Sequence, residues 1–356
     1  MKMYGQTKDL KTSAICVNWS LIQGVRYILF GYKRFFKLAS FLKFKNMKYY
    51  TLLLSFLLTH SLSGQMAMLM GNPREVEPLS VDYGVIPDLG GTEIARYQIG
   101  AMFGKKLGKG RLGIGVGYQY LDFTFDETTN LLDVSSYAQM HIIGTNVSYL
   151  RPLKNNWGLI VMGGASIMSN LDDGITGEDF VFNTLIGANK QWGDHNKGSS
   201  LLFGLLYGTQ FGEPTILPAV AFRQQLNERW SYSLGLPITG INFQFHPKHR
   251  LSALASPQGI FGNNSSEVAV DGNRILKDTK LQFNGINTRL AYRYHFAKHL
   301  AFLTEVGFVP GATLKILDND NEEIYDFDPG SGAYFNLGLR FVLNPQNLKQ
   351  KSQKPD

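Results

Sequence analysis

The sequence predicts an all-β protein, an antiparallel transmembrane β-barrel of about 12 strands that follows a cleaved signal peptide. Three observations support this prediction: several stretches alternate apolar and small polar residues with a period of two, an aromatic turn pattern recurs four times, and an export signal precedes them. Glycine is abundant at 38 residues and aromatic residues make up 13% of the chain, a composition that favours strands over helices.

The export signal lies at residues 47–65, where a basic start is followed by the apolar run Leu52–Leu58 and then by small residues. This order describes a secretory signal peptide, which we expect to be cleaved near residues 63–65. A membrane anchor is the alternative, but the apolar run is shorter than the ~18 residues that a spanning helix needs. We interpret residues 1–46, which precede the signal, as an over-extended start or a disordered leader.

The net charge of +7 belongs to the leader rather than to the body of the protein. Residues 1–46 contain nine basic residues and one acid, Asp9, so residues 66–356 carry a net charge of −2 once Lys48 is also counted. A nucleic-acid-binding domain needs clustered basic residues on its folded part, so we expect no nucleic-acid partner. The only cysteine is Cys16, so the exported body cannot hold a disulfide, a thiolate metal site or a cysteine nucleophile.

Alternation is clearest in the segments 112–120, 230–238 and 335–343, where apolar residues interleave mainly with glycine, serine, asparagine or glutamine. Period two indicates strands whose two faces meet different surroundings. A soluble sandwich would carry lysine, glutamate and threonine on its polar face, whereas small polar residues suit the interior of a barrel whose apolar face meets lipid. We expect residues 66–343 to form one membrane β-barrel and residues 344–356 to form a polar C-terminal tail.

A recurring turn places bulky apolar residues four positions apart on both sides of charged and turn-forming residues. Each copy looks like a tight hairpin. Rings that flank short turns at one level would form the interfacial girdle of a membrane barrel. The girdle predicted in this way contains Tyr149, Trp157, Phe222, Trp230 and Tyr292.

These signals together predict twelve strands, joined alternately by short turns and longer connections, as at the periplasmic and outer ends of bacterial barrels. We place the long connection 244–279 outside the cell, with its tip at residues 262–266 mobile and facing outward. The alternative is an undetected strand pair inside 250–276, with Leu251–Ile260 as its best candidate, which would raise the count to fourteen. The predicted strands are 76–85, 92–103, 111–123, 138–150, 157–169, 180–192, 199–211, 214–225, 229–243, 280–295, 300–314 and 332–343.

The closing segment Tyr334–Phe341 alternates aromatic and polar residues and looks like an outer-membrane assembly signal, although a polar tail follows it. With the leader around Leu52 and the four aromatic turns, this segment makes the chain resemble the uncharacterised outer-membrane β-barrel families of Gram-negative bacteria, which are domains of unknown function. The resemblance implies an outer-membrane location, contact with outer-membrane lipid and lipopolysaccharide, and insertion by the barrel-assembly machinery. It implies no activity, no cofactor and no particular small solute.

Inward-facing charges on the last three strands are the best functional candidates. The alternation places Arg289, Arg293, Glu305 and Arg340 on the lumen side, where buried charges need partners or water. We expect a ladder in which Arg289 and Arg293 pair with Glu305 and Arg340 lies nearby. Two interpretations remain open: an anion-preferring constriction in a pore, or a structural salt-bridge network that fills the lumen.

We expect no metal site and no cofactor. The loop residues Asp318, Asp320 and Glu322 are spaced as oxygen ligands for calcium, but the glycine that an EF-hand loop requires is missing, and a solvated acidic loop is the alternative. His246 and His249 lie three residues apart, with basic neighbours that would repel a divalent cation.

The sequence favours a passive pore, a transport barrel or a structural membrane protein. The alternative is an outer-membrane enzyme that hydrolyses lipid or peptide on a barrel scaffold. Such an enzyme would need a serine near a histidine, but no serine stands two residues after His141, and the chain has no Gly-x-Ser-x-Gly motif.

Overall fold

A computed structural model describes four stretches of the chain, residues 75–126, 133–193, 197–270 and 274–343. The predictions made for the leader, the signal peptide and the C-terminal tail lie outside the described residues, at 1–46, 47–65 and 344–356.

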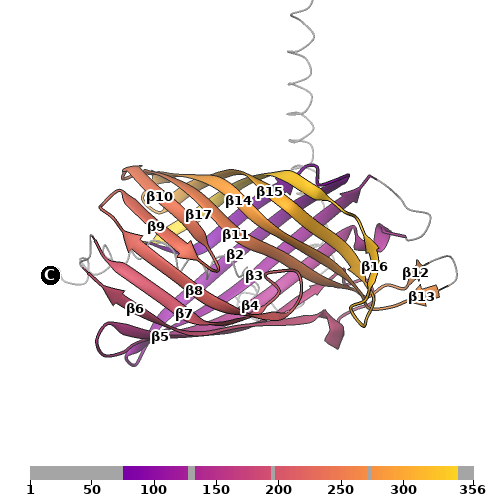
Figure 1. The fold of residues 1–356 in the computed structure, drawn as a ribbon, viewed down its shortest axis with the longest axis horizontal. Helices are drawn as coiled ribbons and strands as arrows, with labels where there is room; N and C mark the ends of the chain where they lie inside the picture. Colours follow the sequence, from indigo (N-terminus) through magenta and orange to yellow (C-terminus); the bar gives the residue numbers. More distant parts are fainter. Residues whose placement is uncertain (1–74, 127–132, 194–196, 271–273, 344–356) are drawn as a thin grey trace, which may run out of the picture. The chain divides into compact units, whose positions relative to one another are not determined.

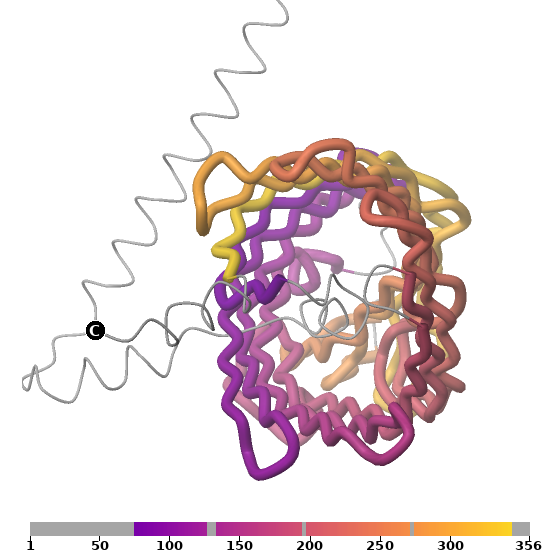
Figure 2. Tube along the Cα trace, turned by 90° about the vertical axis from the view of Figure 1, so that its left-hand side faces the viewer, coloured from indigo at the N-terminus to yellow at the C-terminus, as the bar shows by residue number. Residues whose placement is uncertain are grey.

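The described strands form one closed antiparallel barrel of fourteen strands (Figure 1). Consecutive wall strands pair with one another, and β1 pairs with β17 to close the ring that Figure 2 shows. Closure gives every wall strand two neighbours, which a strand needs if its backbone is to be hydrogen-bonded inside a membrane. The wall strands are β1 (Val76–Ile86), β2 (Thr92–Leu107), β3 (Gly110–Phe125), β4 (Gln139–Pro152), β5 (Trp157–Ser169), β6 (Phe180–Trp192), β7 (Ser199–Gly208), β8 (Thr215–Gln225), β9 (Trp230–Gly235), β10 (Thr239–His246), β11 (His249–Asn264), β14 (Thr279–Ala297), β15 (Leu300–Leu317) and β17 (Gly330–Leu343).

Three short strands lie outside this wall. β12 (Val268–Val270) and β13 (Arg274–Leu276) form a hairpin of their own, and β16 (Glu323–Asp326) pairs with the end of β15. The segments η1 (Ser135–Tyr137) and η2 (Gly177–Asp179) are single 3₁₀ turns, and no helix among the described residues is long and apolar enough to cross a membrane.

The prediction of about 12 strands is wrong by one pair, and the fourteen-strand alternative is confirmed. The segment 229–243, predicted as one strand, is divided into β9 and β10 by a turn that contains Pro237. Proline has no N–H to donate to a strand ladder. The Thr239 hydroxyl closes the turn instead, because it accepts from the N–H of Gly235 and donates to the C=O of the same residue, each at 2.9 Å.

The predicted outer connection 244–279 is therefore mostly wall. The chain turns back after β10 at residues 247–248, and β11 contains the candidate segment Leu251–Ile260. The expectation that residues 262–266 form an outward-facing tip is also wrong, because Asn264 is fully buried.

The two ends of the barrel differ. At one end, the turn end, short turns join the strands, and these include the predicted turns near 104–110, 151–156, 226–228 and 296–299. The predicted turn 193–198 contains residues 194–196, which lie outside the described residues. At the opposite end, the loop end, the longer connections carry η1, η2, the β12–β13 hairpin and β16, on the right in Figure 1. In bacterial barrels short turns are periplasmic and long loops extracellular.

Alternation along the wall strands separates an apolar outer face from a lumen face. In β17, Phe335, Leu337 and Leu339 project outward and are 44–49% exposed, whereas Asn336 and Arg340 face inward and are buried. The described outer surface carries many such exposed large apolar side chains, on nearly every wall strand. A surface of this kind suits contact with lipid rather than with water.

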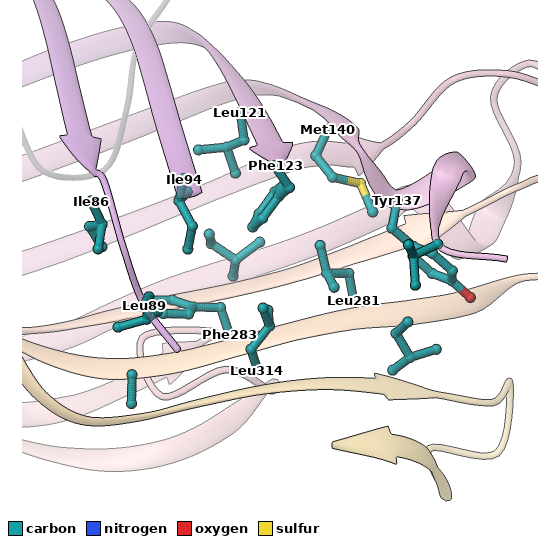
Figure 3. Packing of buried hydrophobic residues seen from close by; sticks show 14 of the residues in the cluster. Ile86, Leu89, Ile94, Leu121, Phe123, Tyr137, Met140, Leu281, Phe283 and Leu314 are labelled. Atoms are coloured by element: carbon teal, nitrogen blue, oxygen red, sulfur yellow. The ribbon is translucent and has the colours of Figure 1, made fainter. Parts of the chain in front are cut away.

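Apolar side chains fill the inside of the loop end (Figure 3). Phe283, Leu281 and Leu314 are completely buried there, and Tyr137 reaches them from η1. Burying a side chain of this size stabilises a fold by roughly 1.5–3 kcal/mol. We call this cluster the apolar plug, and its other buried members are Ile86, Leu89, Ile94, Leu121, Phe123, Val134, Met140, Ile260, Val268, Val270, Val309, Ala312, Ile316 and Tyr334.

A buried polar network beside the plug fixes the end of β11. Asn263 forms a parallel bridge with Ser169 of β5, a strand that is not its neighbour in the wall. Its side-chain amide donates to Asp179 Oδ1 at 2.8 Å and accepts from Lys280 Nζ at 3.0 Å. At the loop end the neighbour of β11 is therefore β5 instead of β10.

Candidate functional site in the lumen

The barrel encloses a cavity of about 500 Å³. Its lining extends from Glu228 and Arg229, in the turn between β8 and β9, to Ile260 and Tyr334 of the apolar plug. Because the plug fills the loop end, the cavity lies between the plug and the turn end.

A chain of ion pairs crosses the lumen face of β1, β17 and β14. Arg340 lies 2.6 Å from Asp82 and 3.2 Å from Glu77, measured between nitrogen and oxygen. Arg293 lies 2.6 Å from Glu77 and 3.5 Å from Glu75. Each of these two arginines thus joins two carboxylates, so the charges form one continuous row.

The same row continues toward the plug. Arg289 Nε lies 3.1 Å from Glu305, and a second nitrogen of its guanidinium donates to the Ser256 hydroxyl at 2.9 Å. The Tyr334 hydroxyl accepts from Arg96 at 2.8 Å and donates to Glu305 at 3.4 Å. Two arginines and one carboxylate therefore meet directly beneath the plug.

The structure places all four predicted lumen residues, Arg289, Arg293, Glu305 and Arg340, on the lining of the cavity, although their pairing differs from the expected one. Glu305 pairs with Arg289 alone, while Arg293 and Arg340 bind carboxylates from the start of the chain.

Sequence reasoning missed these partners, Glu75, Glu77 and Asp82. Alternation from Val81, which faces outward, would have placed Asp82 inside, but Glu77 would have been placed outside. An irregularity in the pairing of β1 with β17, between Val76 and Leu79, reverses the alternation and turns Glu77 into the lumen.

Arginine outnumbers carboxylates on the described lining. The cavity is lined by seven arginines and five carboxylates, an excess of two positive charges, and by no lysine. Arginine stays protonated even when buried and presents a planar fork that matches carboxylate and phosphate groups. The charged members of the lining are Glu75, Glu77, Asp82, Arg96, Arg223, Glu228, Arg229, Arg250, Arg289, Arg293, Glu305 and Arg340.

The remainder of the lining is uncharged and of two kinds. Amide and hydroxyl side chains, such as Gln98, Asn183 and Ser231, offer hydrogen bonds to a polar solute. Apolar side chains stand among them, and the largest are Met102, Ile142, Met168, Ile238, Leu254, Ile260 and Leu303. The lumen can therefore contact both a charged group and an apolar one.

The predicted girdle residues lie on the outer face near the turn end. Trp230 stacks on Phe243 with ring centroids 4.3 Å apart, and the Tyr292 hydroxyl lies 2.7 Å from His249 Nδ1. Lys190 stands over the Trp157 ring at 5.2 Å, a distance at which the cation attracts the ring face. Phe222 contacts Trp192 and Tyr232, and Tyr149 pairs across strands with Leu112 and Val161.

A second aromatic row, which sequence reasoning missed, crosses the outer face toward the loop end. Tyr83, Tyr97, Tyr120 and His141 are cross-strand partners on β1–β4, with ring centroids 5.0, 6.1 and 5.3 Å apart in that order. On β4, His141 and Tyr149 are eight residues apart, which corresponds to roughly 20 Å along the axis of a tilted barrel. Two aromatic levels at that separation fit the two interfaces of a membrane.

The weak metal candidate does not gather its ligands around a common point. Asp318 Oδ1 accepts the backbone N–H groups of Asp320 and Glu322 at 2.9 and 2.8 Å, so this carboxylate closes a turn. In the part of the chain that the structure describes, no three histidine, cysteine, aspartate or glutamate residues are grouped to hold a metal ion. His246 and His249 belong to the turn-end aromatic residues, with ring centroids 5.3 Å apart.

His141, the histidine considered for a hydrolase, faces outward from β4. Its Nδ1 lies 2.9 Å from the Tyr118 hydroxyl, and the two rings are stacked. This contact makes His141 part of the outer aromatic row.

A closed antiparallel barrel with an apolar outer face, two aromatic levels and a charged lumen defines the class of membrane β-barrels. The chain belongs to the family described as a domain of unknown function, DUF6268, whose model matches residues 105–342. No curated protein matches the chain in sequence.

Solved barrels show only distant similarity. The NanC porin and LpxR from Salmonella typhimurium each have a TM-score of 0.36 and 7% identity, over 74% of this chain and 100% and 99% of theirs. The Pseudomonas putida toluene transporter TodX has a TM-score of 0.30 and 10% identity, over 78% of this chain and 93% of its own. Similarity at this level carries no conclusion about activity.

Proposed function

We propose that the protein is an outer-membrane transport barrel whose lumen admits small anionic solutes from the turn end. The observation that carries this proposal is the cavity of about 500 Å³ lined by seven arginines and five carboxylates inside a barrel with an apolar outer face. A lumen filled only to stabilise the wall would need neither the space nor the excess of positive charge. The outer-membrane location is supported by the closed wall and its two aromatic levels.

The apolar plug should limit the flow of ions through such a barrel. It occupies the loop end, so the resting protein should pass few ions straight through along the barrel axis. Phe283 and Leu314 are both fully buried in the plug, and both lie on the side of the cavity nearest the loop end. Replacing both by alanine should leave a water-accessible gap and raise the conductance.

Conductance of the reconstituted protein in planar bilayers under a salt gradient tests the proposal. We expect low conductance from the wild type, higher conductance from Phe283→Ala/Leu314→Ala, and a reversal potential in that variant that shows preference for the anion. Arg223→Gln, which removes a positive charge from the lining, should reduce this preference, and Arg151→Gln, on an exposed residue near the turn end, should not. Cation preference, or silence of the opened variant, would refute the proposal.

A further inference from the structure

The first described residues, 75–78, form an arm at the turn end of β1. The ladder between β1 and β2 begins at Leu79, so the arm makes none of the described pairings with β2. Beyond Leu79 the ladder with β17 continues only at Val76, opposite Leu343. Pro78 has no N–H that it could donate to a neighbouring strand. In the described part of the chain, one backbone bridge therefore holds the arm to the wall.

The arm turns into the lumen instead of following the wall. β11 is the fourth strand from β1 in the order β1–β17–β15–β14–β11, and neighbouring strands are roughly 4.8 Å apart. Even so, the Glu75 carboxylate accepts two hydrogen bonds from Arg250 of β11, at 3.1 and 3.2 Å. Three consecutive residues of the arm, Glu75, Val76 and Glu77, line the cavity. The arm therefore presents its carboxylates to the charges of distant strands.

The first of these carboxylates lies where the wall needs an anion. Arg250 and Arg293 are cross-strand partners, and both side chains point into the lumen from β11 and β14. Like charges directly opposite one another destabilise a sheet. Glu75 binds both, at 3.1 Å from Arg250 and 3.5 Å from Arg293. An anion beside this arginine pair therefore stabilises the wall, whether the arm or a solute supplies it.

The second carboxylate lies beside the first. Glu77 is 2.6 Å from the same Arg293 nitrogen that Glu75 approaches, and it is 3.2 Å from Arg340. Three arginines thus bind the two carboxylates of the arm, which are close together because they share one guanidinium nitrogen. Arginine binds a carboxylate best through two parallel hydrogen bonds, as Arg250 does here. All five side chains line the cavity and are 11–25% exposed, so a small solute in the cavity reaches them.

We propose that Arg250, Arg293 and Arg340 form a binding site for small dicarboxylates. Glu75 and Glu77 occupy this site as internal ligands until the solute displaces them. A solute with two carboxylates a few bonds apart offers the three arginines the same groups as the arm does. The displaced arm lies at the turn end, where water hydrates its carboxylates, so the exchange leaves no charge buried without a partner. The inference rests on the proposed function and names the class of its solute.

Succinate binding to the folded barrel in detergent tests the site, measured by isothermal titration calorimetry at constant ionic strength. The variant Glu75→Gln/Glu77→Gln removes both internal carboxylates. We expect it to bind succinate about tenfold more tightly than the wild type, because the wild-type site is available only while the arm is displaced. Succinamate, in which an amide replaces one carboxylate, should bind this variant about tenfold more weakly than succinate because it lacks the second charge.

Thermal unfolding of the same variant separates a binding site from a structural ion pair. Without succinate, Glu75→Gln/Glu77→Gln should unfold at a lower temperature than the wild type, because its arginines lose their counter-charges. Succinate should restore the unfolding temperature, since a ligand of the folded state stabilises it, whereas succinamate should not. The matched control is Glu213→Gln/Glu322→Gln, which removes two exposed carboxylates outside the cavity lining. Its succinate affinity should equal that of the wild type.

Two milder variants keep the test valid if the first one folds poorly. Glu75→Gln retains Glu77 between Arg293 and Arg340, so it should fold and still bind succinate more tightly than the wild type. Arg250→Gln/Glu75→Gln removes both members of one ion pair and should also fold. It should lose the affinity gained by Glu75→Gln, because the fork that binds one end of the solute is gone.

No gain of succinate affinity in Glu75→Gln, equal binding of succinamate, or an undiminished gain in Arg250→Gln/Glu75→Gln would overturn the dicarboxylate site. Anion-preferring conductance of the opened variant without any gain in succinate affinity would also overturn the site and would leave the proposed function standing. A gain in succinate affinity, together with cation preference or silence of the opened variant, would support the site and refute the transport role.

Discussion

Arg340 shows what a buried charge requires in this lumen. It is 9% exposed and its guanidinium bonds Asp82 and Glu77. Removing one partner of a buried ion pair costs about 3–5 kcal/mol because the other charge is left without compensation. Glu77 also pairs with Arg293, so Asp82 is the carboxylate that loses most when Arg340 is replaced.

We predict that Arg340→Met lowers the free energy of unfolding by about 3–5 kcal/mol. The double variant Arg340→Met/Asp82→Asn should be more stable than Arg340→Met alone, because Asp82 is then no longer a buried unpaired charge. Thermal unfolding in detergent, followed by the loss of the folded band in gels, measures both. Equal stability of wild type and Arg340→Met would show that water compensates these carboxylates and that the pairs are dispensable.

Asp179, in the 3₁₀ turn before β6, is a buried carboxylate outside the barrel wall. Burial alone would raise its pKa, but hydrogen bonds from the Thr176 N–H and the Asn263 side chain outweigh burial and hold the pKa below its ordinary value. A carboxylate whose pKa is lowered in the folded state stabilises the fold above its unfolded pKa. That contribution is lost as the pH falls through the lowered folded pKa.

We therefore predict that Asp179→Asn destabilises the barrel at neutral pH by about 1–3 kcal/mol. The NH₂ group of the new asparagine would face the N–H groups of Thr176 and Asn263, which are themselves hydrogen-bond donors. The difference from the wild type should shrink below about pH 4, where the wild-type carboxyl also becomes protonated. Asp173→Asn is the control: Asp173 pairs with Lys277 on the surface, and its loss should cost less than about 1 kcal/mol. Unfolding curves of the variants and the wild type at several pH values test this prediction. A difference in stability between Asp179→Asn and the wild type that stays constant at all pH values would contradict a lowered pKa of Asp179.

At the scale of an element, the β10–β11 hairpin decides the topology. In the twelve-strand prediction Lys248 lies in an outer connection, whereas in the fourteen-strand barrel it lies in a tight turn at the turn end. Lys248 is exposed, so it can be labelled in either case.

We predict that a cysteine at Lys248 reacts with a membrane-impermeant maleimide only after the outer membrane has been opened. A cysteine at Lys277, whose side chain is 50% exposed in the connection between β13 and β14, should react on intact cells and serves as the control. Labelling of Lys248→Cys on intact cells would mean that the turn end faces outward.

At the scale of the whole molecule, closure joins strands from the two ends of the chain. β1 pairs with β17 over most of its length, so the wall is not closed until the last strand has paired with the first. Unfolding should therefore be cooperative across the entire barrel. The apolar plug adds a second reason, because its buried members come from eight wall strands, from β12 and from the loops between the strands.

We predict that the folded protein in detergent shows a circular dichroism spectrum dominated by β-structure and migrates in gels differently from the boiled protein. A change of migration in separate steps would contradict cooperative closure, and a monomer that stays soluble without detergent would contradict the membrane barrel.

The amino-acid sequence by itself determined the features that depend on neighbouring residues. Alternation with period two assigns each side chain to a face, so the lumen positions of Arg289 and Arg340 and the outward positions of Trp157 and Trp230 could be predicted. The short turns could also be predicted, because each depends on a few turn-forming residues that lie between aromatic ones in the sequence. Even so, the irregularity in β1 hid the inward positions of Glu75 and Glu77, and the turn at Pro237 hid one strand pair.

Only the tertiary structure decided which residues meet across the lumen. Arg293 and Glu75 are 218 residues apart, and the apolar plug likewise combines distant segments. These contacts depend on the stagger with which fourteen tilted strands close into a ring, and the stagger is a property of the complete wall. The pairing of the charges follows from that closure, whereas the alternation of side chains follows from the backbone of each strand.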